Sequence, residues 1–436
     1  MTIPESSTQR RAFLKFLAVS PLFATTGHLP AILGMLPLGR SERDEFLREV
    51  DTAQAKESII SGQDQAIDVF EFEAAAQKAL PPAHFGYLAT GVDDDHTVRA
   101  NHDGYSRIRI RARRLVDVTH IDMSTSLLGV KWSSPILICP VGSQKAFHPE
   151  GEIAVARAAR AKDHLQILST VATSSIESVI AARGGPVWQQ LYPTNVWEVT
   201  RAIVSRAEAA GCPAIVLTVD LQEGSNRETL FRGQRADQRD CSTCHSGYTG
   251  YARARGGAST GFKGYVARKP MFDGLDVAKV TALHPEAMDW EFVKRLRDLV
   301  KGKLLIKGIV TRDDAQLAVS HGIDAIMVSN HGGRSEETLR PTIESLPEVL
   351  DGVAGKIPIT VDGGVRRGTD IFKALAVGAS AVGVGRPYAW GLAAFGQPGV
   401  EAVLEILRRE LRTIMRQAGT TSIERITPAY VIRQPA

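Results

Sequence analysis

Short apolar segments alternate with amphipathic segments along most of this chain of 436 residues. The short segments are rich in Val, Ile, Leu and Ala, which is typical of strands buried on both faces of a parallel sheet. The eight predicted strands are residues 135–139, 166–169, 187–191, 214–219, 304–307, 325–329, 358–361 and 381–384. Amphipathic helical stretches lie between them, for example at residues 151–161, 196–210, 312–321 and 370–377. Repeated βα units in this number predict an α/β protein with a closed (β/α)8 TIM barrel.

An open, doubly wound sheet is the alternative that uses similar units. Such a sheet is expected to carry a Gly-rich dinucleotide-binding turn after its first strand. Here the first predicted strand runs into Pro140, Val141 and Gly142 instead. The barrel is therefore the preferred interpretation.

Composition agrees with a large globular core, because 44% of the residues are hydrophobic and 23% are charged. The 52 basic and 48 acidic residues are mixed along the chain, and the formal net charge is +4. No basic stripe is interleaved with aromatic residues, which argues against nucleic-acid binding.

The N-terminus resembles a twin-arginine export signal, which carries proteins across a membrane after they have folded. Arg10 and Arg11 precede Ala-Phe-Leu-Lys15, and residues 16–38 contain no Asp, Glu, Lys or Arg. An ordinary basic amphipathic helix is the alternative, and an uncleaved membrane anchor stays open. We expect a signal or anchor at residues 1–40, a linker at 41–65 and the barrel at 66–436, in a periplasmic or membrane-associated protein.

Reactive side chains in such a barrel belong at the C-terminal ends of the strands, because the βα loops there surround one shared mouth. His331 follows the sixth predicted strand and precedes two glycines, Arg334 lies three residues later, and Asp220 follows the fourth strand. This set suits proton abstraction from a carboxylic acid substrate. His331 would act as the base, Asp220 would stabilise the imidazolium, and Arg334 would bind the carboxylate. A purely structural role for His331 is the alternative.

A phosphate site is predicted after the seventh and eighth strands, where Asp362-Gly-Gly-Val-Arg366 and Gly385-Arg386 occur. Glycines let backbone N–H groups approach an anion, and the two arginines can add charge-assisted hydrogen bonds. Phosphate sites recur at this place in the fold, although the glycines can also be read as tight turns. FMN, a phosphate ester, fits this site without a separate nucleotide-binding domain.

Residues 66–436 resemble the FMN-dependent 2-hydroxy-acid dehydrogenases and oxidases, a family that includes glycolate oxidase, lactate oxidase, mandelate dehydrogenase and flavocytochrome b2. The motifs that carry the resemblance are Tyr87-Leu-Ala-Thr-Gly91, His148-Pro-Glu-Gly-Glu152, Gln190-Leu-Tyr192, Thr218-Val-Asp220, Lys307-Gly308, Ser329-Asn-His-Gly-Gly-Arg334 and Asp362-Gly-Gly-Val-Arg-Arg-Gly-Thr-Asp370. The resemblance implies FMN-dependent oxidation of an L-2-hydroxy acid, with lactate as the default, to the 2-oxo acid. Electrons would pass to a cytochrome, a quinone or oxygen, and a homotetramer is expected.

The same resemblance implies roles for individual residues. The implied catalytic residues are His331, Asp220, Arg334, Tyr192 and Lys307, and the lysine would lie beside flavin N1 and O2. The implied substrate-binding residues are Tyr87, Tyr192, Arg227, His331 and Arg334. The implied flavin contacts are Pro140, Val141, Gly142, Ser169, Gln190, Thr218, Lys307, Ser329, Asp362, Gly364, Arg366, Gly385 and Arg386. Hydride transfer and a carbanion mechanism are both compatible with these residues.

Several positions depart from the family pattern. Leu221-Gln-Glu-Gly-Ser-Asn-Arg227 replaces Pro-Arg-x-Gly-x-Arg, so the assignment of Arg227 rests on an altered stretch. Gly142 stands where many oxidases have alanine, Val171 stands where glycolate oxidase has an aromatic residue, and Ser335-Glu-Glu337 replaces Gln-Leu-Asp. These changes predict a substrate pocket that differs from that of glycolate oxidase.

A long segment at residues 224–289 separates the fourth and fifth strands, and we expect an irregular functional loop there. It contains Cys241-Ser-Thr-Cys244-His245, the C-x-x-C-H pattern of haem c attachment. Met271 or another histidine would then be the second axial ligand. A disulfide, a zinc site and a chance pair of cysteines are the alternatives.

Two other function classes are compatible with parts of the pattern. A non-redox FMN barrel isomerase would share the phosphate site but would not need His331, Asp220 and Arg334 together. A pseudoenzyme that serves as an interaction module is the second.

Overall fold

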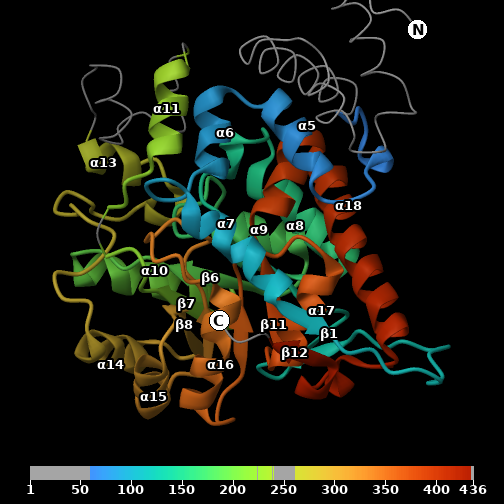
Figure 1. Cartoon of the computed structure of the whole chain (residues 1–436). Coiled ribbons are helices and arrows are strands. Elements are labelled where there is room, and N and C mark those ends of the chain that lie inside the picture. The colour runs from blue at the N-terminus through green and yellow to red at the C-terminus, as the bar shows by residue number, and fades with distance from the viewer. Residues whose placement is uncertain (1–58, 223, 238, 240–260, 434–436) are drawn as a thin grey trace, which may run out of the picture. The chain divides into compact units, whose positions relative to one another are not determined.

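The computed structural model describes residues 59–222, 224–237, 239 and 261–433. Eight parallel strands close into a barrel in the order β10-β11-β4-β5-β6-β7-β8-β9 (Figure 1). Their bounds are β4 Ile136–Ile138, β5 Leu165–Leu168, β6 Val187–Leu191, β7 Ala214–Thr218, β8 Lys303–Ile309, β9 Ala325–Val328, β10 Ile359–Val361 and β11 Ala381–Val384. Each predicted strand coincides with one of these to within two residues at either end. The (β/α)8 TIM barrel is therefore confirmed.

Apolar side chains from alternate strand positions fill the barrel. Its core contains Leu137, Leu165, Ile167, Trp188, Val216, Leu305 and Met327. A hairpin of β2 Thr125–Leu127 and β3 Val130–Trp132 closes the N-terminal end, since Leu127 and Trp132 join the same cluster as the first residues of several strands. The sequence did not reveal this hairpin, because strands of three residues are too short for alternation to be recognised.

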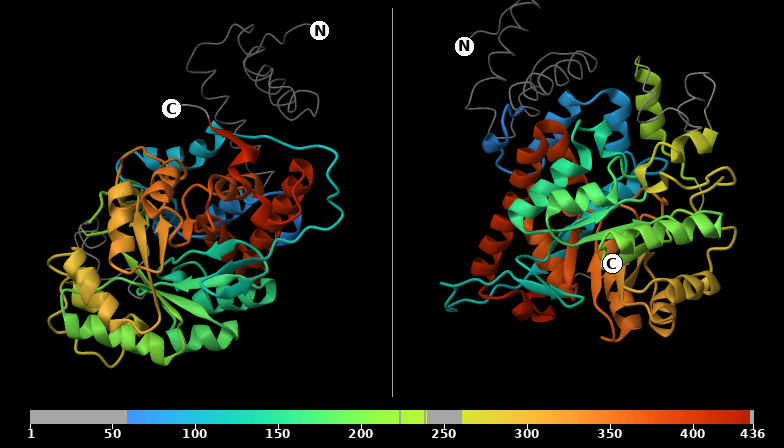
Figure 2. Two further views of the ribbon diagram at one scale, coloured as in Figure 1. Left: turned by 90° about the horizontal axis from the view of Figure 1, so that it is seen from below. Right: turned by 180° about the vertical axis from the view of Figure 1, so that it is seen from behind.

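Helices follow the barrel strands and surround them (Figures 1 and 2). They are α8 Gly151–Lys162, α9 Ile176–Arg183, α10 Trp197–Ala209, α14 Trp290–Leu299, α15 Arg312–Ser320, α16 Thr342–Val353, α17 Gly368–Val377 and α18 Arg386–Ala418. Side chains of Ser175, Asp289 and Thr311 cap α9, α14 and α15 at their first turns, as is typical of helix starts. In the described part of the chain, no helix is long and apolar enough to cross a membrane.

The N-terminal segment of the catalytic unit adds three more helices, α5 Glu71–Ala79, α6 Pro82–Ala89 and α7 His96–Asp103. Helices α5 and α6 contact the long helix α18, and the blue and red ribbons lie together in Figure 2. Strand β1 Ile108–Ile110 pairs with β12 Val431–Arg433, so the chain that follows α7 meets the C-terminal end of the unit in one small sheet. The predicted signal and most of the predicted linker lie outside the described residues.

The segment after β7 is more regular than expected. It contains α11 Glu228–Ala236, α13 Gly261–Val266 and the short 3-10 helix η4 Pro270–Phe272. The prediction of an irregular loop over residues 224–289 was wrong for these parts. Helix α11 has few apolar residues because it buries one narrow face, including Leu230, against α6. A pattern that sparse does not stand out as helical periodicity.

Candidate active site

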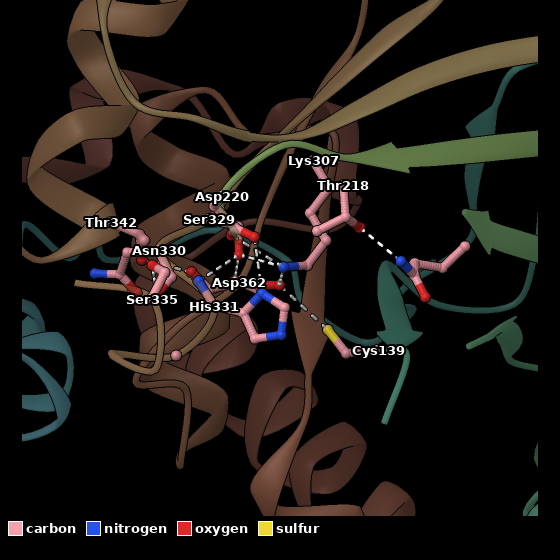
Figure 3. A network of polar contacts seen from close by, with 12 residues as sticks. Cys139, Thr218, Asp220, Lys307, Ser329, Asn330, His331, Ser335, Thr342 and Asp362 are labelled. Atoms are coloured by element: carbon pink, nitrogen blue, oxygen red, sulfur yellow. Dashed lines mark hydrogen bonds and ion pairs between the residues drawn. The ribbon is translucent and has the colours of Figure 1, made fainter. Parts of the chain in front are cut away.

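His331 lies between an acid and a phenol at the C-terminal mouth of the barrel. Its Nδ1 is 2.8 Å from Asp220 Oδ1, and its Nε2 is 3.2 Å from the hydroxyl oxygen of Tyr192. Figure 3 shows the imidazole of His331 next to Asp220 and Lys307. The carboxylate at Nδ1 favours the tautomer in which that nitrogen carries the proton. Nε2 is then the ring nitrogen that can accept a proton.

The turn that presents His331 has an unusual backbone. His331, Gly332 and Gly333 all have positive φ, at 58°, 68° and 76°. At Gly333 a side chain is also sterically impossible, because a Cβ would lie 2.6 Å from the backbone nitrogen of Val98 in α7. The left-handed turn therefore favours the two glycines, and the contact with α7 requires glycine at position 333.

A buried pair of amides holds the same turn in place. Asn330 and Asn101 exchange two hydrogen bonds of 2.9 and 3.0 Å, and both side chains are almost fully buried. Sequence reasoning missed Asn101, which comes from α7 and carries no local signal. Its amide fixes the backbone next to His331.

The charges of the His331–Asp220 pair suit proton transfer. Burial, aided by the charge of Lys307 and opposed by Asp220, lowers the pKa of His331 to about 4. Burial by itself raises the pKa of Asp220, but Lys307 and His331 outweigh burial and lower it to about 2. At neutral pH the imidazole is therefore uncharged and the carboxylate is ionised.

Lys307 places a buried positive charge between two carboxylates. Its Nζ donates to Ser329 Oγ at 2.8 Å and lies 3.6 Å from Asp220 Oδ2 and 3.8 Å from Asp362 Oδ2. Ser329 in turn donates to Asp362 Oδ1 at 2.6 Å. Burial acts to lower the pKa of Lys307, but the two carboxylates raise it above its usual value. The lysine is thus a fixed cation of the site.

Gly308 explains why the motif is Lys-Gly. The pairing of β8 with β9 shifts register between Lys307 and Ile309, which is a bulge at Gly308. Gly308 has a φ of 114°, and a Cβ there would lie 2.8 Å from Asp220 Cβ. The missing side chain lets Asp220 approach the strand that carries Lys307.

Two arginines predicted to bind substrate lie next to each other. The guanidinium of Arg334 stacks over the ring of Tyr87 at 4.6 Å, and Arg227 donates to the carbonyl of Arg334 at 3.3 Å. Burial, together with the charge of Arg227, lowers the pKa of Arg334 to about 10. The paired positive charges would attract a carboxylate. Tyr87, Tyr192, His331 and Arg334 line the cavity described next, whereas Arg227 contacts Arg334 without being part of that lining.

A cavity of about 850 Å³, its open mouth included, occupies the end of the barrel beside His331. Ten of the predicted flavin contacts line it: Pro140, Val141, Gly142, Ser169, Lys307, Asp362, Gly364, Arg366, Gly385 and Arg386. The other three are buried next to the cavity. Among these, Gln190 Nε2 donates to Thr218 Oγ1 at 2.9 Å, and Ser329 lies between Lys307 and Asp362 (Figure 3).

Arg366 and Arg386 concentrate positive charge at one end of this cavity. Arg366 stacks over the ring of Trp390 at 4.7 Å, and burial lowers its pKa to about 10. Burial, with the charges of Arg334 and Arg366, lowers the pKa of Arg386 to about 9. A bound phosphate would relieve this mutual repulsion, so the residues present fit the phosphate of FMN.

Sequence reasoning missed Cys139, which lines the cavity, and Glu73, which lies outside the lining. Cys139 directly follows β4, is buried, and lies with Sγ 3.7 Å from Asp362 Oδ2. Its position next to Pro140 was a usable signal. Glu73 of α5 influences the pKa values of both Arg366 and Arg386, and no local signal could have placed it there.

The metal and haem predictions remain predictions. The described residues contain no group of three or more His, Cys, Asp or Glu side chains that could hold a metal ion. Cys241, Cys244 and His245 lie outside those residues, so neither haem nor a disulfide is tested. Met271 lies in η4 and its side chain is fully buried.

The fold and the site define an FMN-binding (β/α)8-barrel oxidoreductase. The chain belongs to the family described as FMN-dependent dehydrogenase, whose model matches residues 76–433. FMN is its cofactor. A family of dehydrogenases supports the redox interpretation over the non-redox isomerase.

Known relatives cover nearly the whole catalytic unit. A peroxisomal (S)-2-hydroxyacid oxidase of Arabidopsis thaliana is 39% identical over 371 residues, which are 84% of this chain and 97% of the relative. Glycolate oxidase 1 of Oryza sativa subsp. indica is 40% identical over 376 residues, with 84% and 95% coverage. The crystal structure of mandelate oxidase matches with a TM-score of 0.72 at 34% identity, covering 85% of this chain and 99% of that one. A mutant of flavocytochrome b2 matches with a TM-score of 0.73 at 29% identity, with 88% and 91% coverage.

Proposed function

We propose that this protein oxidises an (S)-2-hydroxy acid to the 2-oxo acid, with His331 as the base. The observation that carries the proposal is the position of His331 in the cavity lining, with Nδ1 2.8 Å from Asp220 Oδ1 and Nε2 3.2 Å from the Tyr192 hydroxyl. When bound, FMN accepts the two electrons that the hydroxy acid loses.

Arg334 would bind the substrate carboxylate, and Arg227 beside it adds a second positive charge. A guanidinium binds a carboxylate in a fixed orientation, which places the neighbouring hydroxyl-bearing carbon. The hydroxyl of Tyr192 lies 3.2 Å from His331 Nε2 and would hydrogen-bond the substrate hydroxyl at the same point. The proton to be removed would then face Nε2.

His331 becomes an imidazolium when it takes the proton. Asp220, at 2.8 Å from Nδ1, would stabilise that charge and hold the ring orientation. Lys307 keeps Asp220 ionised before the transfer, since its Nζ lies 3.6 Å from Oδ2. The three groups together provide a base that is uncharged at rest and stabilised once protonated.

An anaerobic screen of single enantiomers tests the proposal. Glycolate, L-lactate, (S)-mandelate and the R forms of the last two would be mixed with the purified holoprotein while the flavin absorbance near its visible maximum is followed. We expect at least one S acid to bleach the flavin and to yield its 2-oxo acid, while the R form does neither. If none of the S acids bleaches the flavin, the proposed function is contradicted.

The electron acceptor, location and assembly are further parts of the proposal. Residues 1–40 would direct export to the periplasm or hold the protein at the membrane, and a cytochrome, a quinone or oxygen would accept the electrons. A homotetramer is expected from the family resemblance. Turnover with oxygen, cytochrome c and a quinone, compared on one preparation, would identify the acceptor. A pyridine haemochrome spectrum of the mature protein would test haem c at Cys241 and Cys244.

A further inference from the structure

The C-terminal end of helix α6 contacts two arginines, Arg334 of the proposed substrate site and Arg386 of the FMN phosphate site. Arg334 Nη1 donates to the carbonyl oxygens of Tyr87 and Thr90, the second at 3.2 Å. Arg386 donates to the carbonyl oxygens of Leu88 at 2.8 Å and Thr90 at 2.9 Å. The last carbonyls of a helix lack partners within the helix and favour cations, so this helix end holds both guanidinium groups.

The other side of α6 packs directly on α11, the helix that follows β7. Gly233 and Gly86 meet at the crossing, where a Cβ on Gly233 would lie 3.5 Å from Gly86 Cα and 2.5 Å from the carbonyl oxygen of Pro82. A Cβ on Gly86 would lie 3.3 Å from the carbonyl oxygen of Thr229. A side chain at Gly233 would clash, so the absence of one lets the two backbones pack closely and couples the position of α6 to that of α11.

Asp237, at the end of α11, holds the start of α6. Its Oδ2 accepts from the backbone nitrogen of Ala83 at 3.4 Å, and its side chain is only 1% exposed. Arg239 pairs with the same oxygen at 2.8 Å. Two more contacts reach the segment after α6: Asn226 Nδ2, just before α11, donates to Asp93 Oδ1 at 2.9 Å, and Thr229 Oγ1, in the first turn of α11, donates to Asp95 Oδ2 at 2.6 Å.

We propose that Gly233 and Asp237 are positioning residues that act through α6 on Arg334 and Arg386. The close packing at Gly233 sets where α6 lies, and the end of α6 sets where the two guanidinium groups lie. Docking of α11 then tunes the binding of the substrate carboxylate and of the FMN phosphate together. This inference rests on the proposed roles of Arg334 and Arg386.

A Gly233→Ala variant tests the proposal, because its methyl group would meet the carbonyl oxygen of Pro82. Affinity for FMN would be measured by quenching of FMN fluorescence on adding the flavin-free protein, and affinity for oxalate by its effect on the absorbance of bound flavin. We expect both dissociation constants to rise by about tenfold, which corresponds to about 1.4 kcal/mol of strain. The matched control is Gly224→Ala in the same segment, where a Cβ would meet nothing within 4 Å, and both constants should stay unchanged.

Asp237 supplies a second, independent variant if Gly233→Ala does not fold. Asp237→Ala removes the acceptor for the Ala83 nitrogen, whereas Asp237→Asn keeps an oxygen there. We expect the alanine variant to raise both dissociation constants and the asparagine variant to restore most of the affinity. A folded variant in which the dissociation constant rises for only one of the two ligands, or for neither, overturns the proposal. Both measurements are of ligand binding and do not depend on turnover. If the protein oxidised no hydroxy acid, the proposed function would be contradicted, but the effect of α11 on FMN and oxalate binding could still be interpreted.

Discussion

His331 Nδ1 and Asp220 Oδ1 are 2.8 Å apart, although the two residues are separated by 111 positions in the chain. Each follows a different barrel strand, β9 or β7, so the closed barrel brings them together. The pair joins a neutral base to an ionised acid at the mouth of the cavity.

Replacing His331 by glutamine should remove the proton acceptor while leaving the FMN site intact. We expect kcat for the best 2-hydroxy acid to fall by about 10²- to 10⁴-fold, the range usual for loss of a general base. FMN content, read from the absorbance of the purified protein, should be unchanged because Arg366 and Arg386 are not touched. Undiminished turnover would remove His331 from the mechanism.

The value of kcat/KM should fall at low pH, and this acid limb of the pH profile should lie well below the usual pKa range of histidine. The pKa of His331 is lowered by burial to about 4, so the imidazole is protonated and inactive only below that pH. The value of kcat/KM should therefore rise as the pH increases through about 4. It should show no change near pH 6.5, the ordinary pKa of a histidine. Two hydroxy acids with different carboxyl pKa values should give the same limb, which separates His331 from the substrate.

Asp220→Asn should move that limb in a defined direction. Asp220 raises the pKa of His331, so its neutralisation should shift the acid limb to lower pH while kcat falls. A limb that moves to higher pH would contradict the electrostatic coupling between the two residues.

Gly142→Ala should narrow the substrate pocket. A Cβ on Gly142 would lie 2.6 Å from Val171 Cγ2, closer than side chains tolerate, so Val171 has to move. We expect kcat/KM for (S)-mandelate to fall relative to that for glycolate. The double variant Gly142→Ala with Val171→Ala should recover the original ratio, and a ratio that is the same in all three proteins would count against this role.

Arg366→Met should weaken the binding of FMN, and only through loss of the contact with the FMN phosphate. Loss of a charge-assisted hydrogen bond is worth about 1.5–3 kcal/mol, which corresponds to roughly 10- to 150-fold in the dissociation constant for FMN. Riboflavin lacks the phosphate, so its affinity for the flavin-free protein should not change. Equal weakening of both ligands would show that Arg366 supports the fold rather than the phosphate.

Lys307→Met should destabilise the protein strongly. The substitution leaves Asp220 and Asp362 buried without their cation, which is expected to reduce the free energy of unfolding by roughly 3–5 kcal/mol. Lys303→Met is the matched control on the same strand, because Lys303 pairs with Asp324 at a half-exposed site and should contribute about 1 kcal/mol or less. Urea unfolding of both variants measures the difference, and equal losses would contradict the buried-charge argument.

The sequence by itself predicted the barrel and the residues of its rim. Strands such as Val187–Leu191 and Ala381–Val384 were predicted at their observed bounds, since a strand buried on both faces must be a continuous apolar run. The same logic predicted His331, Asp220 and the Gly-Arg turns, because closing a parallel barrel brings the ends of all its strands to one mouth.

Tertiary structure decided what local pattern cannot encode. The amide of Asn101 behind the His331 turn, Glu73 near the phosphate arginines, and the end of α6 that holds Arg334 and Arg386 all come from the N-terminal helices. These helices are short, and apart from the motif that begins at Tyr87 their residues carry no local signal of a role in the site. Their roles arise only when distant segments dock, because a contact across the fold depends on packing geometry and not on the periodicity of either segment.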